Sequence, residues 1–495
     1  MNYLDLLKLA SPEATVTVTT LLVLAVGLAS DRARELCSAV AAAGLLFAMA
    51  TVLMLPENAT LFHGMLVITP LTSLFKIICL ALALFTVILA RNDRASRNHG
   101  EYLAMLLLAT IGLMLLVGSE ELLMIFIGLE LTGLSLYVMT GFDKTDVRSA
   151  EAGLKYFLFG STASAFTLFG LSLIYGMTGT TGLVAIAERL NEQPSLPLLF
   201  VGIVMTLVGL AFKIAAAPFH LWVPDTYQGA PVASAAFIAS GSKVASFVVL
   251  GKIVLVGFGP DSGSAAWHGL TAGWVPVLAA LAVLSIVIGN LVALVQKNVR
   301  RLLAYSAVAH TGYTLLGLVA GGRNGFSATL FYTTVYAFTL IGAFGVVAIV
   351  RRRTGGDDLA NFAGLIRLPG SGPMLAGCMA IFMLSLAGLP PLAGFFGKFY
   401  LFTAAMRAVP NNGLLWLVAL ALLGSLISLY YYLIVLKVIF VDSTDPSSLK
   451  PEAVSPEPFR VDFLQRLSLG ILAAFVLVLG VLPGVLVTQI LAALP

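Results

Sequence analysis

Charged side chains are scarce in this sequence. Aspartate, glutamate, lysine and arginine make up 11% of the 495 residues, whereas a soluble domain has about 25%. Hydrophobic residues reach 59%, and the mean hydropathy is +1.00. The apolar runs are long and continuous, and they lack the alternation over about ten residues that a membrane β-barrel requires. These features exclude a soluble protein and predict a single all-α helical bundle in a lipid bilayer.

The sequence also lacks the motifs of redox and nucleotide chemistry. Its three cysteines, Cys37, Cys79 and Cys378, lie far apart and form no C-x-x-C pair, which argues against an iron-sulfur or structural zinc site. No G-x-G-x-x-G or P-loop stands between a strand and a helix. We therefore expect this chain to bind no metal and no cofactor of its own, and no nucleic acid.

Apolar runs of roughly 17 to 25 residues predict a polytopic bundle of about fourteen transmembrane helices. The expected spans are 15–29, 36–55, 71–90, 102–118, 120–141, 153–175, 198–217, 232–256, 273–294, 301–320, 327–350, 373–408 (interrupted), 413–440 and 465–490. The first run lacks a basic n-region and a convincing cleavage site, so we interpret it as a retained helix.

Basic residues outside the spans fall mostly in every second loop. The expected inward loops hold Arg32, Arg34, Arg91, Arg94, Arg97, Lys144, Arg148, Lys297, Arg300, Arg301, Arg351, Arg352, Arg353, Arg367, Lys450, Arg460 and Arg466. The expected outward segments hold Lys8, Arg189, Arg323 and Arg407. This positive-inside asymmetry predicts that both termini lie on the outer side of the membrane. The proline-rich stretch 442–462 is then an inward connector.

Two spans are interrupted by proline. Pro218 follows Lys213 in one span, and Pro390 and Pro391 precede Lys398 in another. Proline frees backbone carbonyls, which at membrane depth are tolerated only where protein or a water-filled cavity satisfies them. The breaks lie five spans apart, so hydropathy predicts two inverted five-helix repeats, 102–256 and 257–440, between an N-terminal part, 1–101, and a C-terminal part, 441–495. Broken helices in matching positions indicate an ion pathway.

Four ionisable residues lie deep in or between apolar runs. They are Glu130, Lys213, Lys243 and Lys398. Because a charge in lipid is costly, such residues are usually functional, and we favour an ion-pathway role over packing for each. One carboxylate and several lysines make a poor metal cage, whereas burial and opposite charge poise such groups for proton exchange. The pattern therefore favours protons as the cargo.

Other polar residues have less decisive positions. Lys76, Lys252 and Lys437 lie near span ends, where snorkelling to the interface is the preferred interpretation. Lys155 could pair with Glu151 one turn away or belong to a pathway. His310 could relay protons or only hydrogen-bond in the core, and a functional role is slightly favoured for His220, beside the first break.

Several long motifs, in order, resemble one known family. The motifs are Leu-Glu-Leu-Thr at Glu130, residues 148–157, residues 212–231, Ser242-Lys243, residues 300–313 and residues 389–400. They closely resemble the antiporter-like membrane subunits of proton-pumping NADH:quinone oxidoreductase, respiratory complex I. Within that family, the lysine at Lys398 and the absence of a long lateral helix resemble the subunit N type.

The resemblance implies roles for individual residues. Glu130 and Lys213 would be an interacting pair, Lys243 the central proton carrier reached from inside, and Lys398 the carrier leading outside. His310 would connect the two carriers, and Lys155 matches a position of lesser role. The resemblance also implies a bacterial inner membrane, neighbouring antiporter-like subunits as partners, and NADH, FMN, iron-sulfur clusters and quinone bound in other subunits.

Two other classes share part of this pattern. A subunit of a multi-subunit sodium/proton antiporter would have the same fold and similar lysines but no redox partner; Lys398 argues for subunit N instead. A quinone-binding membrane protein is the second alternative, but no residue cluster in the sequence identifies a headgroup pocket.

Overall fold

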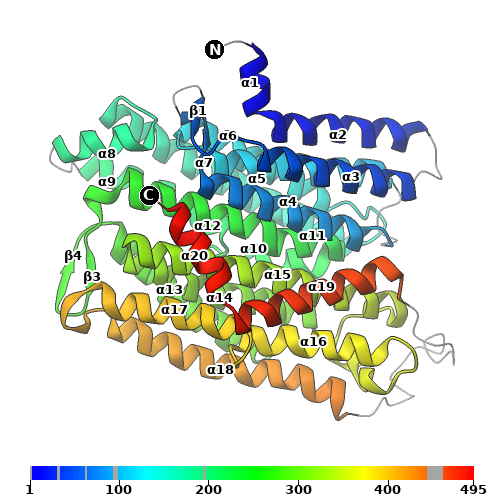
Figure 1. The fold of residues 1–495 in the computed structure, drawn as a ribbon. Helices are drawn as coiled ribbons and strands as arrows, with labels where there is room; N and C mark the ends of the chain where they lie inside the picture. Colours follow the sequence, from blue (N-terminus) through cyan, green and yellow to red (C-terminus); the bar gives the residue numbers. More distant parts are fainter. Residues whose placement is uncertain are drawn as a thin grey trace.

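The computed structural model describes residues 3–29, 34–61, 64–92, 98–192, 197–442 and 461–494. Over these residues the chain forms a bundle of roughly aligned helices with two short β-hairpins (Figure 1). Twelve of the described helices are long and apolar enough to cross a membrane. With the two interrupted spans, this agrees with the predicted total of about fourteen. The predicted all-α membrane bundle is confirmed.

The first half of the chain supplies one side of the bundle. Its helices are α1 (Tyr3–Leu9), α2 (Ser11–Ala29), α3 (Arg34–Leu53), α4 (Pro70–Ala90), α5 (His99–Gly118), α6 (Leu122–Thr140), α7 (Val147–Thr178), α8 (Leu183–Glu192), α9 (Pro197–Lys213), α10 (Trp222–Gly229), α11 (Val232–Phe237) and α12 (Lys243–Lys252). Two π-helical segments, η2 (Ile238–Ser242) and η3 (Ile253–Gly257), flank α12. Strands β1 (Ala59–Leu61) and β2 (Leu66–Ile68) pair antiparallel before α4.

The second half begins with a 3-10 turn, η4 (Gly259–Asp261), and the antiparallel hairpin of β3 (Ser264–Ala266) and β4 (Gly269–Thr271). Its helices are α13 (Trp274–Ala293), α14 (Val299–Ala320), α15 (Gly322–Thr354), α16 (Gly372–Ala387), α17 (Ala393–Ala408), α18 (Leu415–Phe440), α19 (Phe463–Val481) and α20 (Gly484–Ala493), with the 3-10 turns η5 (Leu359–Phe362), η6 (Leu365–Arg367) and η7 (Pro410–Asn412).

Both predicted breaks are confirmed. The first separates α9 from α10, and the second separates α16 from α17. The best-buried long spans are 232–257, α14 and α15. In each of them, 94% of the most apolar stretch of 18 residues is buried inside the protein. These spans therefore form the centre of the bundle, and the broken helices pack around them: α10 and α17 both contact α14, and α17 also contacts α15.

Some boundaries differ from the prediction. Helix α7 begins at Val147, earlier than expected, because Asp146 caps it by accepting a hydrogen bond from the backbone of Arg148. The last predicted span, 465–490, is two helices, since Pro483 interrupts it between α19 and α20. Both hairpins and α8 were not predicted. Most of the 442–462 connector, together with Arg32, Arg94, Arg97, Lys450 and Arg460, lies outside the described residues.

Candidate functional site

Lys213 approaches α6 close to Glu130, but the two side chains do not form the expected direct pair. Glu130, in the middle of α6, accepts a hydrogen bond from the Ser164 hydroxyl of α7. Lys213, the last residue of α9, donates to the Tyr137 hydroxyl at 3.3 Å. Its Nζ would lie 2.7 Å from a Cβ placed on Gly133, one turn beyond Glu130. No ion pair within 4 Å joins Glu130 and Lys213, so a serine and a tyrosine are their immediate partners.

The first break is satisfied by neighbouring helices. The backbone oxygen of Ile214 accepts from the Thr311 hydroxyl of α14 at 2.6 Å, and the backbone N–H of Ala217 donates to Ser285 of α13 at 2.8 Å. The indole of Trp222 donates to the carbonyl of Phe212 at 3.2 Å. Pro218 has no N–H for the Ile214 oxygen, so a side chain from the other half of the chain binds that oxygen, as irregular backbone at membrane depth requires.

Lys243 lies at the centre of the bundle. It is 3% exposed and begins α12 directly after the π-helical segment η2. Its ammonium donates to the backbone oxygen of Ala307 on α14 at 2.5 Å and lies 5.1 Å from the centre of the Tyr336 ring. Single π turns inside helices are frequent at functional sites. The ammonium thus reaches α14 one turn before His310.

His310 is held between two tyrosines. Its Nδ1 lies 2.5 Å from the Tyr332 hydroxyl, and its Nε2 lies 2.9 Å from the Tyr432 hydroxyl. In the neutral ring one nitrogen donates and the other accepts. Tyr432 also hydrogen-bonds with Ser306. All these groups are buried, so His310 makes a polar link between α14, α15 and α18.

Lys398 lies near the His310 cluster, against the ring of Tyr313. Its ammonium donates to the backbone oxygen of Ala387 at 3.0 Å and to the Ser425 hydroxyl at 2.9 Å. It also lies 5.1 Å from the centre of the Tyr313 ring, whose hydroxyl accepts from Asn290 at 2.8 Å. Ala387 is the last residue of α16, so the second break supplies the acceptor that holds this lysine.

The tyrosines of this region were not predicted as site residues. Tyr313, Tyr332, Tyr336 and Tyr432 all contact His310 by ring or hydroxyl. The sequence did hold one signal, because Tyr332 and Tyr336 stand four apart in a predicted span, which places their hydroxyls on one face of a helix. Lys243, the His310 cluster and Lys398 form a buried polar series in which each lysine meets the cluster through a tyrosine ring, Tyr336 for Lys243 and Tyr313 for Lys398.

Charged residues gather where the helices end on the side with the basic loops. Lys155 pairs with Glu151 at 2.6 Å and with Asp225 at 2.8 Å, and Asp225 also pairs with Arg301 at 2.8 Å. The local pair with Glu151 is confirmed, and Asp225 of α10 extends it to α14. His220 is buried in the segment between α9 and α10, with its ring centre 6.4 Å from that of Tyr305.

A second network fixes the start of α14. Asp357 pairs with Arg300 and lies 3.7 Å from Arg351, and it accepts from the Asn298 amide at 2.7 Å. Burial works to raise the pKa of Asp357, but the two guanidinium groups and the amide hold that pKa below its usual range. Arg300 also donates to the backbone oxygen of Ala230 at 2.8 Å, which anchors the junction of α10 and α11.

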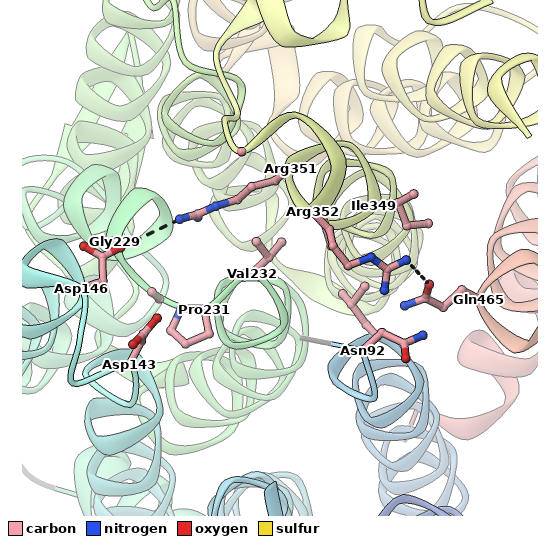
Figure 2. Close-up of a pocket in the computed structure, with 14 residues that line it drawn as sticks. Asn92, Asp143, Asp146, Gly229, Pro231, Val232, Ile349, Arg351, Arg352 and Gln465 are labelled. Carbon is pink, nitrogen blue, oxygen red and sulfur yellow. Dashed lines mark hydrogen bonds and ion pairs between the residues drawn. The ribbon is translucent and has the colours of Figure 1, made fainter. Parts of the chain in front are cut away.

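A cavity of about 260 Å³, lined by both charged and apolar residues, opens beside this junction (Figure 2). Its charged and amide-bearing lining residues are Asn92, Asp143, Asp146, Arg351, Arg352 and Gln465. Arg351 lies 3.9 Å from Asp146 across the cavity, and Arg352 donates to Gln465 at 3.4 Å. Gly229, Ala230, Pro231 and Val232 also line the cavity, so it borders the start of the segment that continues through η2 to Lys243.

Two lysines expected to snorkel are instead buried and paired. Lys76 is 1% exposed and forms an ion pair with Glu13 at 2.6 Å, and Lys252 pairs with Glu120 at 3.4 Å. The prediction was wrong because acidic residues from other parts of the chain reach both lysines, Glu13 from α2 and Glu120 from the connection between α5 and α6. Lys437 does agree with it, since its side chain is 67% exposed and lies 4.0 Å from Asp442. Among the described residues, no group of three or more His, Cys, Asp or Glu side chains could hold a metal ion.

The chain is similar to known membrane subunits over nearly its whole length. The profile of the family described as NADH:quinone oxidoreductase/Mrp antiporter, TM matches residues 119–428. NADH-quinone oxidoreductase subunit N 2 of Acidobacterium capsulatum is 44% identical over 98% of both chains. NADH-quinone oxidoreductase subunit N of Desulforamulus reducens is 39% identical over 89% of this chain and 88% of its own.

Solved structures show the same fold. A chain of respiratory complex I from Thermus thermophilus with bound Aureothin has a TM-score of 0.77 at 32% identity, over 96% of this chain and 98% of its own. A chain of the Mrp complex from Dietzia sp. has a TM-score of 0.81 at 22% identity, over 98% and 97%; that likeness shows the fold alone. The profile match and the identity to subunit N proteins show that this chain belongs to the NADH:quinone oxidoreductase/Mrp antiporter family of membrane subunits.

Proposed function

We propose that the chain translocates protons as subunit N of a NADH:quinone oxidoreductase, coupled to quinone reduction elsewhere in the complex. One observation carries this proposal. A buried polar series, made of Lys243, the His310 cluster and Lys398, links the two halves of the bundle, each of which contains one broken helix. Groups buried this deeply are retained where ions must pass. The identity of 44% to a subunit N protein favours this complex over an antiporter subunit, since the chain is only 22% identical to the chain of the Mrp complex.

In this proposal each residue of the series has one task. Lys243 takes up a proton from the inner side, and the cavity beside the α10–α11 junction is the inward entrance. His310 passes the proton between the tyrosine hydroxyls of Tyr332 and Tyr432. Lys398 receives it and releases it outward. Glu130 and Lys213 act on Lys243 through the charge that they place on α6 and α9.

The setting of the chain is part of the same proposal. We place it in a bacterial inner membrane, with both termini on the outer side, because the basic loops gather at the opposite end. Residues 102–256 and 257–440 would be the two inverted repeats, because each contains one broken helix at a matching place. NADH, FMN, the iron-sulfur clusters and quinone would bind in other subunits, and adjacent antiporter-like subunits would be the partners in the membrane.

The test is Lys243→Ala, which keeps the helix and removes the central ammonium. In membrane vesicles containing the assembled complex, we expect the number of protons moved per NADH oxidised to fall, while NADH oxidation with an artificial electron acceptor stays unchanged. Lys437→Ala, at an exposed lysine outside the series, is the matched control and should pump normally. A wild-type ratio of protons to NADH in Lys243→Ala would remove Lys243 from the pathway and overturn the proposal.

A further inference from the structure

Four charged side chains outside the central series gather at the opposite end of the bundle from the cavity at the α10–α11 junction. Glu13 of α2 pairs with Lys76 of α4 at 2.6 Å, and Glu120, just before α6, pairs with Lys252 of α12 at 3.4 Å. The side chains of Lys76 and Lys252 are 1% and 5% exposed, whereas that of Glu120 is 32% exposed. The cluster is therefore buried on its lysine side and open to the surface at Glu120.

Both lysines lie against the same turn, the C-terminal end of α5. Lys252 donates to the backbone oxygens of Val117 at 3.0 Å and Ser119 at 3.5 Å. A Cβ on Gly118 would lie 3.4 Å from the ammonium nitrogen of Lys76. The last carbonyls of a helix lack intrahelical partners and carry partial negative charge, so they stabilise cations. The end of α5 thus joins the two ion pairs into one cluster.

The cluster is connected to the central series by a single helix. Lys243 is the first residue of α12 and Lys252 the last, and a π-helical segment stands at each end, η2 before Lys243 and η3 after Lys252. Nine residues along a helix correspond to roughly 13 Å. The two ammonium groups lie on opposite faces of α12, Lys243 against Ala307 of α14 and Lys252 against the end of α5, because nine residues turn a helix through about two and a half turns. Ser246, which stands between them in the sequence, is also buried. The proposed central carrier therefore has a second lysine beyond it toward the surface.

We propose that Lys252 and Glu120, supported by Lys76 and Glu13, form a second outward proton route from Lys243, parallel to the route through Lys398. The inference rests on the proposed function. In the last step, the ammonium of Lys252 gives one proton to the carboxylate of Glu120, which leaves a neutral amine and a carboxylic acid. The acid then releases the proton to water outside and returns to a carboxylate. Lys76, held by Glu13, keeps a second positive charge beside Lys252 and favours release of that proton.

A static clamp between helices is the competing explanation for these charges. A clamp needs only charge and packing, and apolar residues of similar volume often hold buried helices as well or better than an ion pair does. Proton transfer needs something more, namely that Lys252 gives up its proton. Arginine separates the two explanations, because its guanidinium keeps the positive charge and does not deprotonate in proteins.

The experiment compares Lys252→Arg with Lys252→Met in the assembled complex, alone and combined with Lys398→Ala. We expect both substitutions to lower the number of protons moved per NADH to the same extent. In the Lys398→Ala background they should remove what that variant still pumps, because both outward routes are then closed. Glu120→Gln, at the exposed end of the cluster, should act in the same direction. Lys437→Arg controls for a lysine-to-arginine change elsewhere.

Two results would overturn the inference. One is normal pumping in Lys252→Arg, whatever Lys252→Met does, because a residue that cannot deprotonate would then suffice. The other is wild-type pumping in every Lys252 and Glu120 variant, with or without Lys398→Ala. If the Lys252 variants do not assemble, Glu120→Gln decides alone, since it sits at the rim. Impaired pumping in Lys243→Ala with normal pumping in these variants rejects the second route and leaves the proposed function standing.

Discussion

Lys398 donates a 3.0 Å hydrogen bond to the backbone oxygen of Ala387, the last residue of α16. In a continuous α-helix that oxygen would accept from the N–H of residue 391, but Pro391 has no N–H. The proline therefore leaves a carbonyl free, and the lysine that follows the break uses it. The second break and the buried ammonium are one arrangement rather than two separate features.

This relationship predicts the effect of closing the break. Replacing Pro390 and Pro391 by alanine restores two N–H groups, one of which competes with Lys398 for the Ala387 oxygen. We expect the complex to assemble and to pump fewer protons per NADH. We also expect a Lys398→Cys side chain in this background to react more slowly with a polar thiol reagent added outside.

Pro410→Ala, in the turn η7 after α17, serves as the proline control and should have no effect on pumping. Unchanged thiol labelling together with unchanged pumping in the double alanine variant would show that the break only serves packing. Lys398 would then be a snorkelling side chain rather than a carrier.

The position of Lys213 against α6 gives a second prediction. A Cβ on Gly133 would lie 2.7 Å from the Lys213 ammonium, so Gly133→Ala must push the ammonium away from the site between Glu130 and Tyr137. We expect lowered pumping in an assembled complex, since the flexible end of the lysine has to move and the Tyr137 hydroxyl, 3.1 Å from the added Cβ, has to give only by a few tenths of an ångström. Gly377→Ala, where an added Cβ meets nothing within 4 Å, is the control. Equal proton-to-NADH ratios in the two variants would show that the position of the Lys213 ammonium does not matter.

The His310 cluster gives a third prediction. His310→Phe keeps an aromatic ring but loses the links to Tyr332 and Tyr432. It leaves the buried Tyr332 hydroxyl without a partner, which typically costs about 1 to 3 kcal/mol, whereas Tyr432 keeps its hydrogen bond with Ser306. We expect lowered pumping from His310→Phe and a smaller loss from Tyr432→Phe, measured in the same vesicles. Tyr400→Phe, whose ring packs on Phe331 away from the cluster, should be normal; full activity in His310→Phe would exclude the relay.

The network at Asp357 predicts a pH-dependent contribution to stability. The pKa of Asp357 is lowered in the folded chain, so its contribution is fully present above the unfolded value of about 3.9 and is lost as pH falls through the lower folded value. Asp357→Asn leaves Arg300 without its buried partner, which costs about 3 to 5 kcal/mol. We expect a lower melting temperature of the purified complex at pH 7.

The difference between Asp357→Asn and wild type should persist at pH 5 and shrink only below about pH 4, where the wild-type carboxylate itself becomes protonated. Asp442→Asn, at a carboxylate 4.0 Å from the exposed Lys437, should change little at any pH. A difference that does not depend on pH would show that the network stabilises by packing rather than by charge.

Much of the architecture follows from local properties of the chain. Run length predicts the spans, and Pro218, Pro390 and Pro391 predict the breaks, because lipid requires continuous backbone hydrogen bonding and proline interrupts it wherever it stands. The depth of Glu130 and Lys243 follows from counting along a span. The short hairpins and α8 were not predicted because they lie in connecting segments, where hydropathy carries little signal.

The sequence by itself therefore determined the solvent, the approximate number of spans, the two breaks and the depth of Lys243 and Lys398, but not the burial of Lys76 and Lys252. Only the tertiary structure decided which partner each charge meets: Glu13 for Lys76, Glu120 for Lys252, Tyr137 rather than Glu130 for Lys213. Those contacts depend on how each helix is rotated about its axis. A helix that is apolar all round shows no preferred face in its sequence, so packing against helices distant in the chain sets that rotation.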